Sequence, residues 1–155
     1  MNMIIIEKLF LVMIAILGAG YFCAIETALL SLAGTSLSIL KERFPSKATY
    51  FLIWEERPHY LLATIVVGTN AFNMASSVLA TSLSFDLIKF PGMSGFIGVL
   101  TPAMVIVSVL FFAEIIPKVY ARRNPERIAT LGMKLLAVSA RYITPLSVLL
   151  VEISE

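Results

Sequence analysis

Two acidic residues lie deep inside apolar stretches of this sequence, where a carboxylate is costly. Glu26 lies in the apolar run that begins near Leu9, and Glu114 lies in the run that begins near Phe96. An ionisable side chain at the bilayer centre costs at least about 2.5 kcal/mol, and such residues face a protein interior or an aqueous path. We therefore predict that Glu26 and Glu114 both point into a helix bundle.

A second polar group lies between these acids in the chain. Asn70, Asn73 and Ser77 follow i, i+3, i+7 spacing, which places them on one helix face. Carboxylate and amide oxygens are hard ligands that suit Mg²⁺, Ca²⁺ or Na⁺. The alternative is structural hydrogen bonding between helices, worth ~0.6–2 kcal/mol for each asparagine. Three apolar segments that each offer oxygen ligands at compatible depth favour an ion pathway, so we expect the asparagines to face the bundle as well.

Pro117 follows Glu114 by three residues. A proline has no N–H, so it cannot donate to the carbonyl of Ala113 in an α-helix. That oxygen would then be free for water or an ion beside the Glu114 carboxylate. Alternatively, Pro117 ends the helix at the membrane interface, since Lys118 follows directly.

The residue types give little support for catalysis, zinc binding, phosphate binding or nucleic-acid binding. The one histidine, His59, lies beside Pro58 at a segment boundary, and no Cys/His cluster has zinc spacing. No glycine-rich stretch matches a phosphate-binding loop. The one cysteine, Cys23, allows no intrachain disulfide, and a scattered net charge of +2 does not suit nucleic acid. We therefore predict that the protein is not an enzyme and has no nucleic-acid partner.

The elements that must position these residues are membrane helices. The chain has 155 residues, of which 59% are hydrophobic and 14% charged, whereas a soluble domain carries about a quarter charged residues. The core of so small a domain cannot bury this many apolar side chains, so lipid must cover the remaining ones. A spanning helix needs roughly 20 apolar residues, and the sequence has several such stretches. We predict one all-α integral membrane domain over residues 1–155.

The domain divides into six segments. We expect transmembrane helices over about 3–33, 58–83 and 96–117, a juxtamembrane pair of short helices over 34–57 that is broken at Pro45, a connector over about 84–95, and an interfacial helix over about 125–153. Asn124, Pro125 and Glu126 are typical of a helix start, because they supply an N-cap, a proline at the first position and an acid in the first turn.

Basic residues mark the side of the membrane on which each connector lies. The first connector and the region after the third helix each hold four Lys or Arg residues, whereas the second connector holds only Lys89 and the N-terminus only Lys8. Positive-inside counting therefore predicts an N-terminus outside and a C-terminus in the cytoplasm.

Three runs of sequence carry a family resemblance. YFCAIETALLSL (21–32), GTNAFNMASSVLAT (68–81) and FFAEIIPKVYARRNPERIA (111–129) together resemble the membrane domain of the CorC/CNNM family, long labelled DUF21. The resemblance covers nearly the whole chain. It implies Na⁺-coupled Mg²⁺ efflux by a homodimer in the plasma membrane, with three spanning helices and a belt-like fourth helix. It also implies cytosolic CBS domains in the full-length protein, which lie outside these 155 residues.

The resemblance also implies a set of site residues. The family's third-helix acid falls on Glu114, its second-helix asparagine on Asn73 with Asn70 nearby, and its first-helix acid on Glu26. The first-helix motif, usually Ser-Gly-x-Glu, here reads Cys23-Ala24-Ile25-Glu26. A thiol is a poor Mg²⁺ ligand, so we expect a distorted first helix to offer backbone carbonyls at Cys23 or Ala24 instead.

Two other functions remain open at this point. The first is a membrane-anchored Mg²⁺ sensor that binds the ion without moving it, which the altered first-helix motif favours. The second is a structural anchor for cytosolic domains. Ion flux separates the transporter from both alternatives.

Overall fold

The computed structural model describes residues 2–32, 34–88 and 95–152, and these residues are helical almost throughout. The elements are α1 (Asn2–Ser31), α2 (Gly34–Arg43), η1 (Pro45–Lys47), α3 (Ala48–Glu56), α4 (Pro58–Ile88), α5 (Gly95–Ser108), η2 (Val109–Ile115), α6 (Ile116–Arg123) and α7 (Pro125–Glu152). Among the described residues there is no strand, and the predicted all-α fold class is confirmed.

Three helices in the described part of the chain are long and apolar enough to cross a membrane. They cover Met3–Ser31, Pro58–Leu87 and Leu100–Arg123, which are 29, 30 and 24 residues long. At 1.5 Å per residue, each exceeds the ~30 Å hydrocarbon core of a bilayer. The third crossing is built from α5, η2 and α6 in continuous succession. The predicted three crossings agree with this finding.

Two of the spanning helices extend beyond their predicted ends. α4 continues to Ile88, where we expected an end near 83, and Ser84 in the added part is buried, with its hydroxyl donating to the Ala80 carbonyl at 3.2 Å. The third crossing continues to Arg123, where we expected an end near Pro117. Pro117 lies in the first turn of α6, a position that tolerates proline. Of the predicted connector 84–95, residues 89–94 lie outside the described residues.

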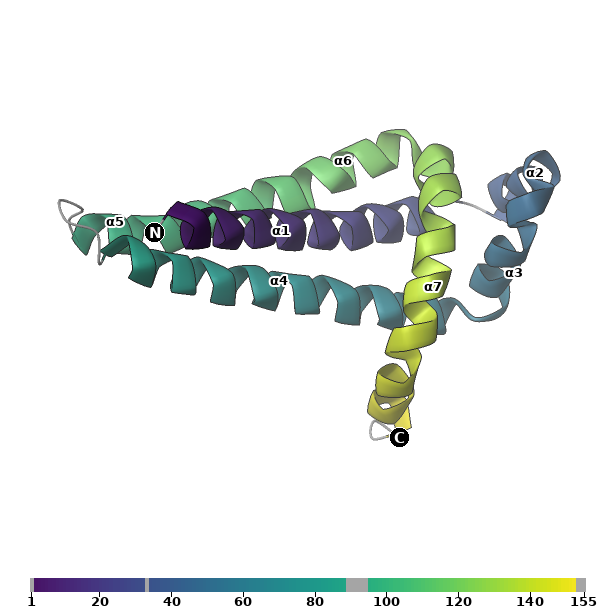
Figure 1. The fold of residues 1–155 in the computed structure, drawn as a ribbon. Helices are drawn as coiled ribbons and strands as arrows, with labels where there is room; N and C mark the ends of the chain where they lie inside the picture. Colours follow the sequence, from purple (N-terminus) through teal and green to yellow (C-terminus); the bar gives the residue numbers. More distant parts are fainter. Residues whose placement is uncertain (1, 33, 89–94, 153–155) are drawn as a thin grey trace.

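α1 is the central helix of the bundle. It packs against α4 on one side and against η2 and α6 on another, while α5 packs against α4. The three crossings run alongside one another, and α7 lies across one end of them (Figure 1). α2 and α3 lie beyond α7, at the right of the same view. All three crossings therefore meet along α1.

Glycines and phenylalanines fit reciprocally between α1 and α4. A Cβ added to Gly18 would lie 2.5 Å from the Phe72 ring, and one added to Gly68 would lie 2.6 Å from the Phe22 ring. The two rings lie 6.0 Å apart at their centroids. Each glycine thus makes room for a ring of the opposite helix, which is how small residues let membrane helices approach closely.

The two ends of the bundle are held differently. At the N-terminal end of α1, Lys8 forms an ion pair with Asp86 and donates to the Ser82 hydroxyl at 2.7 Å. At the other end, α1, α3, α4 and α7 share the most buried part of the core, which includes Ile25, Leu29, Phe51, Leu61, Met133 and Leu136. The middle of the bundle lies between these two sets of contacts.

α7 has one face in the core and one exposed. Met133, Leu136 and Ala140 are buried, whereas Leu131, Leu135 and Val138 are exposed apolar residues. The Tyr21 hydroxyl donates to the Gly132 carbonyl at 2.8 Å and joins α7 to α1. A helix with an exposed apolar stripe that lies across the bundle end suits the membrane interface.

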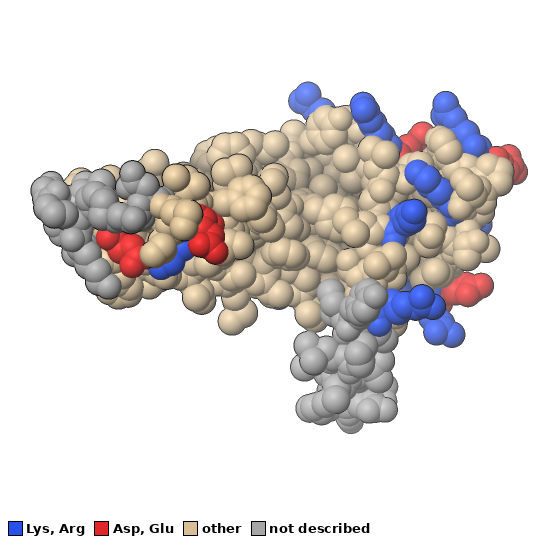
Figure 2. All heavy atoms as spheres, viewed as in Figure 1, with Lys and Arg blue, Asp and Glu red and all other residues tan. Residues whose placement is uncertain are grey.

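Basic side chains gather at the end of the bundle where α7, α2 and α3 lie, which we call the basic end (Figure 2). The basic residues of this end include Lys41, Arg43, Lys47, Arg57, Lys118, Arg122, Arg123 and Arg127. At the opposite end Lys8 is paired with Asp86, and Figure 2 shows basic and acidic side chains side by side there. Charge therefore distinguishes the two ends of the spanning helices.

Candidate functional site

The third crossing is interrupted by a π-helix that contains Glu114. This segment, η2, covers Val109–Ile115, and the Ile116 amide donates to the Phe111 carbonyl five residues earlier. In this register the next donor would be residue 117, a proline without an N–H, and the carbonyl left without that donor is Phe112. Our expectation of a free Ala113 carbonyl assumed α-helical spacing and stays a prediction, and the π-helical register adds the Phe112 carbonyl as a second oxygen that Pro117 affects.

α1 lies close against this π-helix. A Cβ added to Gly20 would lie 3.1 Å from the Phe112 carbonyl oxygen and 3.3 Å from the Pro117 ring, so a larger residue would make the neighbouring atoms shift by a few tenths of an ångström. One turn further along α1, the Cys23 thiol lies 4.0 Å from the Glu114 carbonyl oxygen as a weak donor. Two carbonyl oxygens of η2 therefore face α1.

Charged side chains surround the Cys23 thiol. Glu26, Glu114 and Lys118 all lie close enough to interact with it electrostatically. Glu26 and Glu114 are both half-buried, which agrees with an orientation towards the bundle rather than towards lipid. The structure thus brings the two intramembrane acids to the same junction of α1 and the third crossing.

α4 contributes two buried oxygens that need a partner. Within the described part of the chain, the Thr69 hydroxyl oxygen and the Asn73 side-chain oxygen are buried and have no hydrogen-bond partner. The two residues are one helical turn apart, so these oxygens lie on the same side of α4. A buried oxygen without a partner costs about 1–3 kcal/mol and calls for an explanation, such as an ion or water.

Thr69 was not among the predicted site residues. The sequence signal was its spacing, because Thr69 precedes Asn73 by four residues and the two are neighbours on the helix surface. Asn70 and Ser77, seven residues apart, lie farther from each other. Threonine is common in membrane helices as a hydrogen-bonding residue. Its type alone therefore could not mark it as part of a site.

A cavity of about 250 Å³ separates α4 from α5 and the start of η2. It is lined by Asn73, Ser77, Ala80 and Thr81 from α4, by Pro102, Val105 and Ile106 from α5, and by Val109 from η2. Polar groups line it on the α4 side and apolar groups on the other. The cavity thus opens a space between Asn73 and the π-helix.

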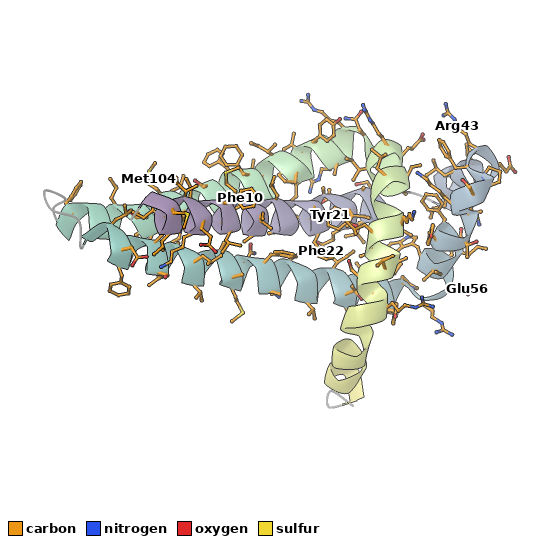
Figure 3. All side chains as sticks on the ribbon, in the orientation of Figure 1. Phe10, Tyr21, Phe22, Arg43, Glu56 and Met104 are labelled. Atoms are coloured by element: carbon orange, nitrogen blue, oxygen red, sulfur yellow. The ribbon has the colours of Figure 1, made fainter. Side chains whose placement is uncertain are left out.

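Two other predicted site residues, Asn70 and Ala24, lie elsewhere. Asn70 is exposed on the described chain, so our expectation that it faces the bundle interior was wrong. Three residues advance a helix by 300°, which turns Asn70 about 60° from Asn73. Ala24 lies towards α7, in a cavity of about 240 Å³ that Tyr21 and Gly132 also line. Figure 3 shows Tyr21 extending from α1 beside α7.

The expected distortion of the first helix is also corrected. α1 is one continuous α-helix from Asn2 to Ser31, so its carbonyls are engaged by the helix itself. The Cys23 carbonyl accepts a further bond from the Thr27 hydroxyl at 2.9 Å. The irregular backbone lies in the third crossing instead, because Pro117 is there and α1 contains no proline.

The available donors are hard oxygens, and few of them are carboxylates. No group of three or more His, Cys, Asp or Glu residues in the described ranges is placed to hold a metal ion. The candidate ligands are therefore the acids Glu26 and Glu114 and neutral oxygens of Thr69, Asn73 and η2. Mg²⁺ is commonly bound in this way, by one or two carboxylates while it keeps several waters.

Comparison with known proteins identifies a family of membrane domains. The family profile described as the Cyclin M transmembrane N-terminal domain, CNNM, matches residues 10–155. A UPF0053 protein of Haemophilus influenzae is 31% identical over 147 residues, which are 94% of this chain and 34% of that protein.

Two further relatives extend the comparison. The UPF0053 inner membrane protein YfjD of Escherichia coli is 29% identical over 137 residues, covering 88% of this chain and 31% of YfjD. A chloroplastic DUF21 domain-containing protein of Arabidopsis thaliana is 26% identical over 125 residues, covering 80% of this chain and 18% of that protein. The chain thus spans about a third or less of the length of these relatives. It belongs to the cyclin M (CNNM) transmembrane domain family, a family of membrane domains linked to metal-ion transport.

Proposed function

We propose that this domain transports Mg²⁺ across the membrane through a site between α1, α4 and η2. The two unpartnered oxygens of Thr69 and Asn73 carry the proposal, because they are buried at a depth where water is scarce and are chemically suited to the ion. Glu114 lies in the π-helix and supplies negative charge near the Phe112 carbonyl. An ion bound there would satisfy oxygens that the protein leaves without partners.

The remaining parts of the proposal follow from charge and family membership. Basic residues at the basic end favour its placement in the cytoplasm, with the N-terminus outside. The resemblance to the CorC/CNNM family favours a homodimer in the plasma membrane that exports Mg²⁺ while Na⁺ enters. Such coupling requires the two ions to favour different conformations, since a ligand with equal affinity for both conformations shifts nothing.

Flux in liposomes tests the proposal directly. The purified chain is reconstituted with a Mg²⁺-sensitive dye inside, and flux is measured with and without a Na⁺ gradient. Glu114→Gln removes the charge while keeping the shape, and we expect it to reduce gradient-driven flux at least tenfold. Glu56→Gln is the matched control, because Glu56 is an exposed acid at the end of α3 (Figure 3). Equal flux in both variants would remove Glu114 from the mechanism.

A sensor that binds Mg²⁺ without moving it is the second candidate. The Cys23 thiol lies against the Glu114 carbonyl, where a family serine would offer a harder oxygen. This contact favours an ion site that is weaker than in relatives with serine. Mg²⁺-dependent thermal stabilisation without flux would select the sensor, and the absence of both would leave a structural anchor.

A further inference from the structure

A second cavity lies at the basic end, away from the candidate ion site. Its volume is about 410 Å³, and it is lined by Arg43, Phe44, Lys47, Glu126, Arg127, Thr130 and Leu131. The first three residues come from the end of α2 and from η1, and the others come from the first two turns of α7. The cavity is therefore formed where the juxtamembrane helices meet the interfacial helix.

The side chains around this cavity are predominantly cationic. Three of them are Arg or Lys, and Glu126 is the one acid among them. The ion pairs of the described residues are Lys8 with Asp86 and Lys41 with Glu55, so neither Arg43 nor Arg127 is paired with a carboxylate there. Two guanidinium groups therefore border this space without a neutralising partner.

Part of the cavity wall is fixed in position. The Lys47 ammonium donates to the Thr130 carbonyl at 2.8 Å, which joins η1 to α7. The Thr130 hydroxyl donates to the Glu126 carbonyl at 2.6 Å. The Arg43 guanidinium lies 5.8 Å from the centre of the Phe44 ring, within cation–π range. Lys47 is thus held against α7, Arg43 lies near the Phe44 ring, and Phe44 and Leu131 give the cavity an apolar edge.

The cavity lies at the level of the membrane boundary. The third crossing ends at Arg123, and α7 begins at Pro125. Leu131 and Leu135, on the following turns of α7, are exposed apolar residues that suit insertion among lipid acyl chains. In Figure 3, Arg43 extends from α2 at this end of the molecule. A ligand in the cavity would therefore lie at headgroup depth.

We propose that this cavity binds the phosphate of an anionic phospholipid headgroup. Guanidinium groups bind phosphate oxygens through two parallel hydrogen bonds, and basic pockets at this depth recognise anionic headgroups. The apolar edge formed by Phe44 and Leu131 matches the glycerol and first methylenes of a lipid, which a free phosphate lacks. The bound lipid would hold α7 against η1 and the membrane surface.

Lipid titration of the purified protein tests this site. Phosphatidylglycerol or phosphatidylcholine is added to the chain in neutral detergent, and bound lipid is counted by native mass spectrometry. We expect selective binding of phosphatidylglycerol, weakened about fivefold in Arg127→Gln, since each basic group near an anionic surface contributes about one such factor. Arg43→Gln should weaken it similarly, and Arg127→Lys should retain most of it.

Arg122→Gln is the matched control, because Arg122 is an exposed basic residue at the same end but does not line the cavity. Equal weakening by Arg122→Gln and Arg127→Gln would overturn the proposal, since it would mean a diffuse attraction to the basic end. Inorganic phosphate is tested as a competitor at millimolar concentration. Complete displacement of the lipid by phosphate would also overturn the lipid assignment and identify a free-phosphate site.

Discussion

Asn70 and Asn73 have the same chemistry but different surroundings. The Asn73 side-chain oxygen is buried without a partner, whereas Asn70 is exposed. Sequence reasoning grouped them because three residues form nearly one helical turn. Both asparagines lie on α4, so the rotation of this helix about its axis decides which of them faces the bundle. The fit of Phe22 against Gly68 and of Phe72 against Gly18 sets that rotation.

This difference predicts opposite behaviour of two matched variants. Asn73→Leu removes a buried unpartnered oxygen, which costs about 1–3 kcal/mol, so the variant should be at least as stable as the wild type without ions. It should nevertheless lose the rise in unfolding temperature that Mg²⁺ produces. Asn70→Leu should keep that rise. Thermal unfolding in detergent with and without Mg²⁺ measures both, and an undiminished rise in Asn73→Leu would exclude Asn73 as a ligand.

The residue types alone predicted that Glu26 and Glu114 avoid lipid, because the cost of a membrane-buried charge does not depend on fold details. They did not predict Thr69, since its hydroxyl could equally have bonded within its own helix, as the Thr64 hydroxyl does with the Tyr60 carbonyl at 3.0 Å. Which hydroxyl remains without a partner depends on the packing around it.

At the scale of the element, the π-helix is the feature that positions Glu114. Pro117 indicated a disturbance next to Glu114, but the sequence did not determine its form. A proline is compatible with a helix end, a kink or a π-helix, and the residues next to it do not select one of them. The continuous passage from η2 into α6 is supported by the close contact with α1 at Gly20, which involves residues some 95 positions apart.

Gly20→Ala tests that contact. The added Cβ would lie 3.1 Å from the Phe112 carbonyl, so α1 or η2 would have to move. Overpacking of this kind costs about 1–3 kcal/mol, and we expect an unfolding temperature several degrees below that of the wild type. Ser31→Ala, at an exposed position of the same helix, should unfold at the wild-type temperature. Equal unfolding temperatures for all three proteins would contradict the close approach.

At the scale of the whole molecule, charge and hydrophobicity predicted the architecture well. Three crossings follow from apolar stretches of roughly 20 residues, and the break at Pro45 and the helix beginning at Pro125 follow from patterns a few residues long. The packing of α7 across the bundle end could not be derived in the same way, because it depends on tertiary contacts such as the bond from Tyr21 to Gly132.

The orientation of the molecule in the membrane is a separate prediction. We expect Glu7→Cys, at the N-terminal end of α1, to react with a membrane-impermeant maleimide on intact cells. Arg122→Cys, at the basic end, should react only after the cells are permeabilised. Both positions are exposed, and Cys23→Ser serves as the background because Cys23 is the one native cysteine. The reverse labelling pattern would show that the basic end is outside.

The π-helix also has a mechanical consequence. A π-turn holds about one residue more than an α-turn, so the third crossing stores a surplus residue between Val109 and Ile115. If the π-turn moved along the helix, the residues that it passed would rotate by about 100° and shift by about 1.5 Å. These are the increments of one α-helical residue. Such a shift would turn Glu114 relative to α1, while the contacts of Lys8 with α4 and of Tyr21 with α7 remain in place.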